Sequence, residues 1–307
     1  MTPGATGTAT HVEVEGRQLR LSNLDKVLYP AAGFRKSEVI DYYTRIAPVL
    51  LPHLAGRPLT LKRYPDGVEG ESFYEKRCPS HRPPWVETVP VWTGRTRGDV
   101  DYCLANDLPT LVWLANLATL ELHPSLSRGD DLDRPTTMVF DLDPGGPASL
   151  VECCRVGLLV KELFDDLDVQ VVAKTSGGKG LQLYVPLDTA VDYDRTKSFS
   201  RTVAQLLERR HPKLVVSHMA KELRTGKVFI DWSQNDEHKT TVSVYSLRAR
   251  ERPTVSTPVT WDEVTEVAEG GDPDLLRFEA AAVLDRVARL GDLFRPVLDL
   301  QQELPTL

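Results

Sequence analysis

The sequence predicts an α+β fold in which helices pack on a mainly antiparallel sheet. Between residues 138 and 232, short apolar strands alternate with two amphipathic helices. A hydrophobic content of 41% and a charged content of 26% are typical of a soluble globular chain. With 307 residues, the chain is long enough for one large domain or two moderate ones. The mixed order of strands and helices indicates helices layered on a sheet.

The first 130 residues mix helix, strand and loop patterns. A helix is expected to start at a cap formed by Ser37, because Ile40, Tyr43 and Ile46 follow at helical spacing. In order, we expect a disordered tail at residues 1–10, a strand or hairpin at 11–21, this helix as far as residue 53, loops and strands at 59–91, and a short apolar helix at 109–122.

The remainder of the chain has a clearer rhythm. We expect strands at residues 138–142, 169–173, 181–185 and 228–231, helices at 150–164 and 193–210, an extended piece at 214–216, and a largely helical tail at 261–294. No internal repeat or low-complexity linker divides these elements.

Two classes of protein are disfavoured by composition. No apolar run approaches the ~20 residues of a membrane span, and the N-terminus lacks the charged and apolar regions of a signal peptide. A cytoplasmic protein without a membrane partner is therefore expected. The four cysteines show no paired zinc-ligand spacing, although Cys78 and His81 could supply two metal ligands if further partners existed.

A net charge of −7 argues at first against a nucleic-acid partner. Lysine and arginine are nevertheless clustered, at Lys62-Arg63, Lys76-Arg77, Arg248, Arg250 and Arg252. A locally basic groove on an acidic body remains open, and metal-binding carboxylates would add negative charge without opposing it.

Asp141-Leu142-Asp143 closes an apolar strand and is followed by Pro144-Gly145. Because successive side chains of a strand point to opposite faces, the two carboxylates project together while Leu142 turns into the core. Two carboxylates this close repel each other unless a cation lies between them, and hard oxygen ligands suit Mg²⁺ or Mn²⁺. The alternative is an ordinary turn or cap at the strand end.

Residues 175–180, Thr-Ser-Gly-Gly-Lys-Gly, form a glycine-rich turn before the strand at 181–185. Its backbone N–H groups could converge on an anion, and Lys179 adds a charge suited to phosphate. In the strand that follows, Gln182 shares a face with Tyr184, where both could meet a ligand. The spacing is not that of a Walker A motif, and a simple hairpin turn is the alternative.

Two later segments could complete a site for phosphoryl transfer. Asp231 closes the strand at 228–231 and could be a third oxygen ligand for a pair of divalent ions, or merely a strand-end cap. Arg248 and Arg250 alternate onto one face, where they could neutralise a polyphosphate or simply be solvated.

Taken in order, these motifs resemble one family. It is the polymerase domain of the bacterial multifunctional ATP-dependent DNA ligase D, a branch of the archaeo-eukaryotic primase superfamily. The resemblance spans residues 19–292 and rests on Leu21-Ser22-Asn23-Leu24-Asp25-Lys26, Lys36-Ser37, Lys62-Arg63-Tyr64-Pro65-Asp66-Gly67, Phe140-Asp141-Leu142-Asp143-Pro144-Gly145, Ser176-Gly177-Gly178-Lys179-Gly180-Leu181, Phe229-Ile230-Asp231-Trp232-Ser233-Gln234-Asn235 and Tyr245-Ser246-Leu247-Arg248-Ala249-Arg250.

The resemblance implies a primase-polymerase fold and a template-directed nucleotidyltransferase. Such an enzyme fills gaps and extends DNA ends during Ku-dependent end joining, uses two Mn²⁺ or Mg²⁺ ions, and takes NTPs or dNTPs with ribonucleotides inserted readily. It further implies a single domain at residues 11–307, with a DNA-binding subregion at 11–130, a catalytic core at 131–260 and a helical tail at 261–307. Gapped or broken DNA with a 5′-phosphate, Ku and an ATP-dependent ligase are the implied partners, and the implied location is cytoplasmic, at the nucleoid.

Residue roles carry over by position. The metal ligands and catalytic residues would be Asp141, Asp143 and Asp231. The triphosphate would be held by Ser176, Lys179, Gln182, Gln234, Arg248 and Arg250, with His123 nearby. A 5′-phosphate would bind Asn23, Lys26 and Lys36, the template base would stack near Phe73 and Tyr74, and Lys62 and Lys76 would face the DNA backbone.

One residue departs from the family pattern. The family usually has a histidine where this chain has Gln182, and a neutral amide can donate to a phosphate but cannot become cationic. This difference keeps two alternatives open: a primase or lesion-tolerant polymerase outside end joining, and a DNA-end-binding scaffold with weakened catalysis.

Overall fold

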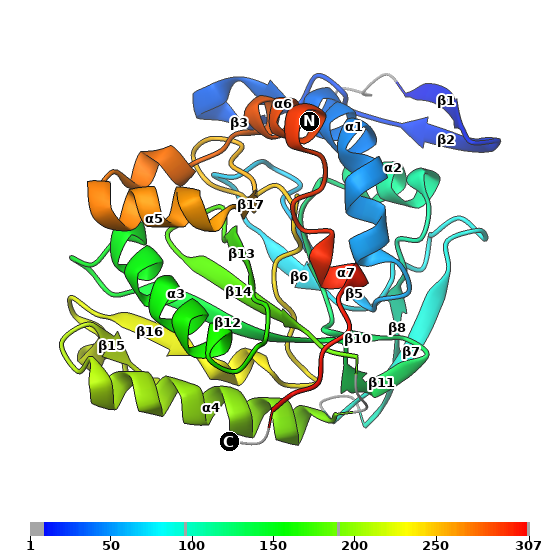
Figure 1. Ribbon diagram of the computed structural model, residues 1–307. Coiled ribbons are helices and arrows are strands. Elements are labelled where there is room, and N and C mark those ends of the chain that lie inside the picture. Colours follow the sequence, from blue (N-terminus) through cyan, green and yellow to red (C-terminus); the bar gives the residue numbers. More distant parts are fainter. Residues whose placement is uncertain (1–8, 95–96, 189–190, 306–307) are drawn as a thin grey trace.

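The computed structural model describes residues 9–94, 97–188 and 191–305 and is built around two β-sheets (Figure 1). The six-stranded sheet, here termed the catalytic sheet after the catalytic core that the sequence resemblance implies, has the strand order β15 (Val215–Val216), β16 (Val228–Asp231), β12 (Thr137–Pro144), β14 (Leu181–Pro186), β13 (Val172–Thr175) and β17 (Pro258–Val259). Its neighbouring strands are antiparallel except for β15 and β16.

The second sheet has five strands and precedes the catalytic sheet in the chain. Its order is β6 (Phe73–Glu75), β5 (Leu59–Arg63), β8 (Gly98–Cys103) and β7 (Thr88–Thr93), with β9 (Thr119–Pro124) also paired to β5. Three two-stranded pairs complete the strands: β1 (Thr10–Val14) with β2 (Arg17–Leu21), β3 (Val27–Tyr29) with β4 (Phe34–Arg35), and β10 (Ser127–Arg128) with β11 (Asp131–Pro135).

Helices cover both sheets. The α-helices are α1 (Lys36–Leu54), α2 (Leu108–Asn116), α3 (Leu150–Asp165), α4 (Tyr193–Arg210), α5 (Trp261–Gly270), α6 (Ala280–Leu290) and α7 (Pro296–Asp299). Short 3₁₀ helices lie at η1 (Pro30–Ala32), η2 (Lys221–Arg224), η3 (Trp232–Gln234) and η4 (Pro273–Leu276). Within the described residues, no helix is long and apolar enough to cross a bilayer.

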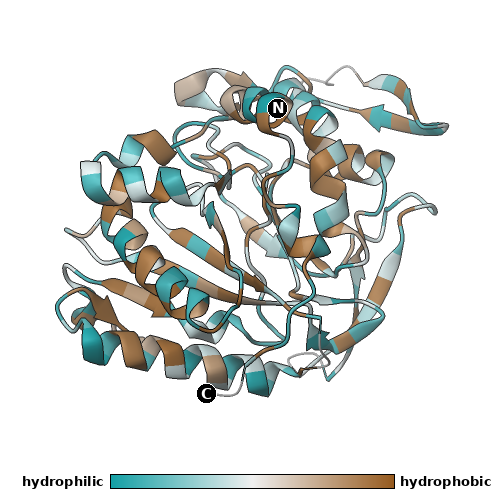
Figure 2. Cartoon of the chain, in the orientation of Figure 1, coloured by the Kyte–Doolittle hydropathy of each residue, from teal (hydrophilic) through white to brown (hydrophobic). Residues whose placement is uncertain are grey.

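One face of the catalytic sheet is apolar and packs under α3, α4 and α5 (Figures 1 and 2). Phe140 of β12 contacts Phe164 of α3, which in turn contacts Phe199 of α4. Because side chains alternate along a strand, the residues between these core positions emerge on the opposite face. That opposite face carries Asp141, Gln182 and Asp231, so the packing of the core determines where the polar groups stand.

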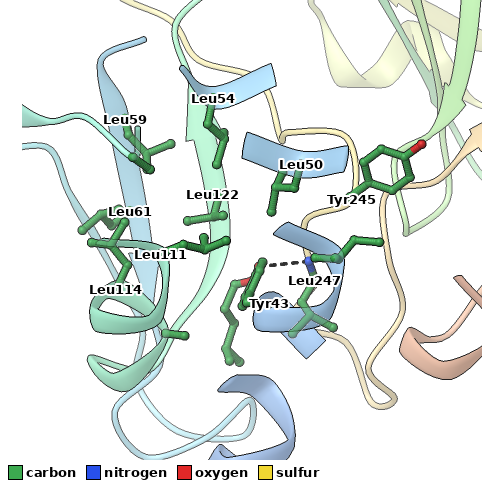
Figure 3. Close-up of a cluster of buried hydrophobic side chains, with 14 of the residues drawn as sticks. Tyr43, Leu50, Leu54, Leu59, Leu61, Leu111, Leu114, Leu122, Tyr245 and Leu247 are labelled. Carbon is green, nitrogen blue, oxygen red and sulfur yellow. Dashed lines mark hydrogen bonds between the residues drawn. The ribbon is translucent and has the colours of Figure 1, made fainter. Parts of the chain in front are cut away.

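A second core lies between α1, α2 and the five-stranded sheet (Figure 3). Tyr43 of α1 is 1% exposed, donates a hydrogen bond to the carbonyl of Leu120 (2.7 Å) and accepts one from the backbone N–H of Leu247 (3.1 Å). The leucines around it come from α1, α2, β5 and β9, including Leu50, Leu61, Leu111 and Leu122.

Residues 243–249, here termed the connecting segment, join the two cores. Toward the second core, Ser243 donates its N–H to Leu122, and the carbonyl of Tyr245 accepts from the hydroxyl of Tyr42. Toward the catalytic sheet, the N–H of Tyr245 is bound by Ser256 and that of Arg248 by Thr254. The segment therefore links the sheet that carries the carboxylates to the layer formed by α1 and β9.

The α+β prediction is confirmed, and most elements lie where the sequence places them. The helix expected at residues 193–210 is α4 (Tyr193–Arg210), and the strands at 138–142, 181–185 and 228–231 are β12, β14 and β16. Residues 1–8 of the expected disordered tail lie outside the described residues, and β1 begins at Thr10.

Two local predictions are wrong. The first long helix begins at Lys36 with Arg35 as its N-cap, because the carboxylate of Glu38 accepts the N–H of Arg35 (2.7 Å); Ser37 lies inside the first turn. The helix expected at 109–122 ends at Asn116, since Ala118 has a positive φ of 57° and Thr119–Pro124 pairs with β5 as β9.

The possible metal pair of Cys78 and His81 is also excluded. Cys78 forms a disulfide with Cys103 of β8, so its sulfur is not a metal ligand. The disulfide ties the loop after β6 to the centre of the second sheet.

Replacing Tyr43 by phenylalanine should destabilise the fold by about 1–3 kcal/mol, because the buried N–H of Leu247 loses its acceptor. Urea unfolding followed by circular dichroism measures this change. Tyr74→Phe is the control, since Tyr74 is 60% exposed. Equal stability of Tyr43→Phe and the unmodified chain would contradict the assigned role of this hydroxyl.

Candidate active site

Four polar residues form one row across the catalytic sheet, here termed the transverse row. Asp231 of β16 is the registered neighbour of Asp141 on β12, Asp141 is the neighbour of Gln182 on β14, and Gln182 is the neighbour of Lys174 on β13. Directly opposed side chains on adjacent strands lie close enough to interact. The row thus brings two of the three predicted carboxylates together, and it adds Lys174, which the sequence did not single out.

Asp141 is a carboxylate of this row whose pKa is clearly raised. Burial, together with the negative charge of Asp143, raises the pKa of Asp141 to about 6, although a hydrogen bond from Gln182 opposes the shift. That bond runs from Nε2 of Gln182 to Oδ1 of Asp141 (3.1 Å). A carboxylate that is both buried and close to a second carboxylate is stabilised as an anion when a cation binds beside it.

Asp143 lies two residues further along β12 and is largely exposed. Among the described residues it forms an ion pair with Arg224, whose Nη1 is 3.9 Å from Oδ2 of Asp143. The guanidinium of Arg224 lies over the ring of Phe229, 3.7 Å from its centroid. Arg224 is a residue that sequence reasoning missed, since it lies in a polar 3₁₀ turn with no distinguishing pattern.

Asp231 is held from two sides. Oδ1 accepts hydrogen bonds from the N–H (3.0 Å) and the hydroxyl (2.5 Å) of Ser233, and Oδ2 accepts one from Nε2 of Gln234 (2.8 Å). The polar residues that follow the strand therefore orient its terminal carboxylate. Gln234, expected at the triphosphate, lies beside this carboxylate in the structure.

The glycine turn at 176–180 packs between β12 and the arginines. The hydroxyl of Ser176 closes the turn by accepting the N–H groups of Gly178 (3.3 Å) and Gly180 (3.1 Å), and Nη1 of Arg248 donates to the carbonyl of Ser176 (2.7 Å). A Cβ on Gly180 would stand 2.4 Å from the carbonyl oxygen of Leu142. Only glycine therefore allows the turn to lie this close to Asp141 and Asp143.

The charged ends of the turn and of the arginine motif are open to solvent. Lys179 and Arg250 are exposed, and Lys179 lines a cavity of about 230 Å³ with Gly177, Gly178 and Arg277. Among the described residues, Lys179 and Arg250 form no salt bridge that a phosphate at this turn would displace, whereas Arg277 pairs with Asp274 (3.1 Å).

Glu121 is a buried carboxylate that anchors two predicted nucleotide-site residues. Its Oε2 lies 3.0 Å from Nε2 of His123, and its Oε1 lies 3.3 Å from Nε of Arg248 and accepts the N–H of Ala249 (3.0 Å). Burial alone would raise the pKa of Glu121, but the hydrogen bond from His123 and the charge of Arg248 hold this pKa at about 2. Burial also lowers the pKa of His123, so its imidazole is neutral.

The predicted DNA-facing aromatic residues lie on the edge strand β6. Phe73 and Tyr74 are 44% and 60% exposed, which leaves their rings available for stacking. Nζ of Lys62 lies 5.1 Å from the centroid of Tyr74, and the ring of Tyr74 meets His123 edge-on at 5.7 Å. The Tyr74 ring therefore connects the exposed strand to His123, a predicted nucleotide-site residue, whereas Lys76 is exposed and donates to the carbonyl of His238 (3.4 Å).

A basic cluster stands at the N-terminus of α1. Lys36 is the first residue of the helix and donates to the carbonyl of Ser22 (2.6 Å), while Lys26 pairs with Asp66 (2.7 Å). Burial, with the positive charges of Lys26 and Arg63, lowers the pKa of Lys36 to about 8. Asn23 is exposed in the adjoining turn, with a φ of 54°. Helix N-terminus and cations together favour an anion here.

The carboxylates fit a divalent cation in their chemistry. Asp141, Asp143 and Asp231 supply hard oxygen donors, and burial, followed by repulsion from Asp143, raises the pKa of Asp141. Across residues 9–94, 97–188 and 191–305, however, no three His, Cys, Asp or Glu side chains already form a closed metal cluster. The side chains would have to turn toward an ion, as both oxygens of Asp231 now accept protein hydrogen bonds.

Comparison with known proteins gives a consistent result. The family described as "LigD, primase-polymerase domain" matches residues 35–294. The multifunctional non-homologous end joining protein LigD of Mycolicibacterium smegmatis is 45% identical over 282 residues, which cover 91% of this chain and 36% of that protein. The bifunctional non-homologous end joining protein LigD of Bacillus subtilis is 31% identical over 275 residues, which cover 89% of this chain and 43% of that protein.

A solved structure has the same fold. The polymerase domain of Mycobacterium tuberculosis Ligase D, in complex with DNA, superposes with a TM-score of 0.85 at 41% identity, covering 92% of this chain and 98% of that one. The fold class predicted from the sequence is thus confirmed. The chain spans well under half the length of the two LigD relatives.

Replacing Glu121 by glutamine should remove stability in a pH-dependent way. Because the folded-state pKa of about 2 is below the ordinary value, Glu121 stabilises the fold above about pH 4.3, and this contribution is lost as the pH falls toward 2. We expect Glu121→Gln to be less stable by about 3 kcal/mol at pH 7, with the gap closing in acid.

Urea unfolding between about pH 7 and about pH 2.5 measures the gap, with the exposed Glu266→Gln as the control. A gap of constant size across this range would contradict the ion pairing assigned to Glu121.

Proposed function

The chain belongs to the LigD primase-polymerase family, and we propose that it is a template-directed nucleotidyltransferase of DNA end repair. It would fill gaps and extend broken ends by two-metal phosphoryl transfer, with a preference for ribonucleotides. The observation that carries this proposal is the cross-strand pair of Asp141 and Asp231, placed beside a glycine turn that Arg248 holds. Opposed carboxylates next to a cradle for phosphate are what nucleotidyl transfer requires.

The incoming nucleoside triphosphate would bind along the glycine turn. Lys179, Arg248 and Arg250 would neutralise its phosphates, and the turn lies close enough to β12 to bring the α-phosphate to Asp141 and Asp143. Ser176, Gln182 and Gln234 hold the turn and the carboxylates in place, and could exchange these bonds for bonds to phosphate. His123, neutral and oriented by Glu121, would contact the nucleoside.

Divalent cations held by Asp141, Asp143 and Asp231, Mn²⁺ or Mg²⁺, would orient the primer 3′-hydroxyl and offset charge on the departing pyrophosphate. The protein contributes the alignment of the two substrates, which converts a bimolecular reaction into a positioned one. No side chain is assigned as a general base.

The DNA would lie over the exposed strand β6 and the N-terminus of α1. Phe73 and Tyr74 would stack on the template base, because stacking on an aromatic face tolerates every base. Lys62 and Lys76 would attract the backbone without base preference. Lys26, Lys36 and Asn23 would bind a downstream 5′-phosphate, with Arg63 as an additional cation.

The biological setting is proposed from the relatives. The LigD proteins that match are named for non-homologous end joining, and the solved relative was captured with DNA. Ku and an ATP-dependent ligase are the proposed partners, and a cytoplasmic, nucleoid-associated location follows from them. Preference for ribonucleotides and for Mn²⁺ is proposed from the resemblance of the sequence motifs to the family.

Asp141→Asn should abolish nucleotide incorporation while leaving DNA binding intact. We expect single-nucleotide extension on gapped DNA with Mn²⁺ to fall by about 10²-fold or more, because the variant loses a carboxylate that the cations need. A gel assay with one ribonucleotide measures extension, fluorescence anisotropy measures DNA binding, and Asp165→Asn on the exposed side of α3 is the matched control.

Each alternative function predicts a different result. Undiminished extension by Asp141→Asn would contradict the assigned metal site. Absence of extension by the unmodified chain, with DNA binding retained, would favour the end-binding scaffold.

Stimulation by a downstream 5′-phosphate should fall as the pH rises through about 8, the pKa of Lys36. One unit above its pKa only about a tenth of a lysine is protonated, so fewer molecules present the cation. The ratio of extension on 5′-phosphate and 5′-hydroxyl gaps, compared at pH 7 and at about pH 9, measures the effect. Lys36→Gln should reduce the ratio at both pH values, and the exposed Lys213→Gln should not.

A ratio near one for the unmodified chain would instead favour a primase or lesion-tolerant polymerase outside end joining. If the 5′-phosphate stimulates extension equally at both pH values, the role of Lys36 is contradicted, but the proposed polymerase function is not.

A further inference from the structure

Lys174 is fully buried in the catalytic sheet, beneath the candidate site. A buried ammonium is costly, and an apolar side chain of similar size would generally pack there at least as well. Burial lowers the pKa of Lys174 well below its usual range, although the charge of Asp141 opposes the shift. Packing alone therefore does not explain a lysine at this position.

Hydrogen bonds connect Lys174 to Asp141 through one intervening residue, Gln182. Nζ of Lys174 donates to Oε1 of Gln182 (2.5 Å) and to the hydroxyl oxygen of Ser256 (2.7 Å). The hydroxyl of Ser256 donates its hydrogen bond to the carbonyl of Thr175 (2.8 Å), so its oxygen can only accept from Lys174. Gln182 then donates from Nε2 to Oδ1 of Asp141.

The groups at the two ends of this series of hydrogen bonds determine which atoms donate and which accept. Lysine only donates here, and a carboxylate only accepts. An amide reversed at Gln182 would set its oxygen against the carboxylate of Asp141, and this contact is repulsive whether Lys174 is charged or neutral. The two donors that Lys174 uses are present on a charged or a neutral amine, so the arrangement holds in either state.

The consequence for Asp141 is a defined orientation. Oδ1 is engaged by Gln182, whereas no hydrogen bond to Oδ2 is found among the described residues. One oxygen is thus held and the other is left available to a ligand.

A second series of hydrogen bonds from a lysine ends at Asp231. Nζ of Lys239 donates to the hydroxyl oxygen of Ser233 (2.5 Å), which directs the hydroxyl hydrogen to Oδ1 of Asp231 (2.5 Å). Lys239 is half-buried and lies in a different segment, so this observation is independent of the first.

We propose that Lys174 and Lys239 are positioning residues, which orient the cation-binding carboxylates Asp141 and Asp231 through Gln182 and Ser233. This inference rests on the proposed function, because it assigns the lysines a task at the same metal site. The amide of Gln182 acts here as a connector between Lys174 and Asp141, and a neutral imidazole could also accept on one side and donate on the other.

The sign of the effect on metal affinity distinguishes positioning from simple charge. A cation near a metal site repels the metal, so removing it would tighten or leave unchanged the binding of Mn²⁺. Loss of a positioning group has the opposite effect, since outer-shell partners typically contribute 10–100-fold to metal affinity.

Electron paramagnetic resonance titration of Mn²⁺, without nucleotide or DNA, is the test. We expect Lys174→Met to raise the dissociation constant about tenfold. Gln182→Met should do the same, and the double variant should bind no more weakly than Gln182→Met alone, because Lys174 acts through Gln182. Gln182→His should lie closer to the unmodified chain than Gln182→Met does. Lys161→Met, which removes an ion pair on the surface of α3, is the control.

Unchanged or tighter Mn²⁺ binding by Lys174→Met, or an additive loss in the double variant, would overturn the proposal. If Lys174→Met does not fold by circular dichroism, Lys239→Met gives the same test at a half-buried position, with the same expected weakening. Asp141→Asn tests the proposed function separately. If this variant binds Mn²⁺ as tightly as the unmodified chain, or if neither binds it, the proposed metal site and the proposed function fail.

Discussion

Two like charges placed opposite each other are the constraint on which this structure depends. The register of β12 and β16 sets Asp141 against Asp231, and like charges at directly opposed positions destabilise a sheet. The protein surrounds the pair with donors from Gln182, Ser233 and Gln234 instead of separating it. The repulsion between these carboxylates, which would weaken an ordinary sheet, is thereby retained and favours the binding of a cation.

The same sheet separates the carboxylates from the hydrophobic core, because the two groups of side chains lie on opposite faces. Phe140, Leu142 and Ile230 point into the core under α3 and α4, whereas the carboxylates of Asp141 and Asp231 point the other way. Because a strand side chain has no freedom to change face, the packed core positions the polar groups precisely enough for chemistry. Stability and site geometry therefore arise from alternate residues of the same strands.

Sequence reasoning succeeded where a repeating pattern carried the information. Period-two alternation placed Leu142 in the core and Asp141 beside Asp143, and the carboxylate at the end of the strand at 228–231 suggested Asp231 as a third ligand. It missed Lys174, Glu121 and Arg224, since a single polar residue in an apolar or irregular stretch has no period, and its partners lie on other strands. The helix expected at 109–122 failed for a related reason: pairing with β5 overrode the apolar run after Ala118.

In the proposed function, the connecting segment at 243–249 would fix the distance between the metal site and the site for a downstream 5′-phosphate. The carboxylates belong to one core and the basic cluster of α1 to the other, and this segment bonds to both. The span between the growing primer end and a downstream terminus would then be set by the length and bonding of this tie. In the proposed function, changes at Tyr245 or Leu247 would alter the accepted gap length without replacing a residue proposed to contact DNA.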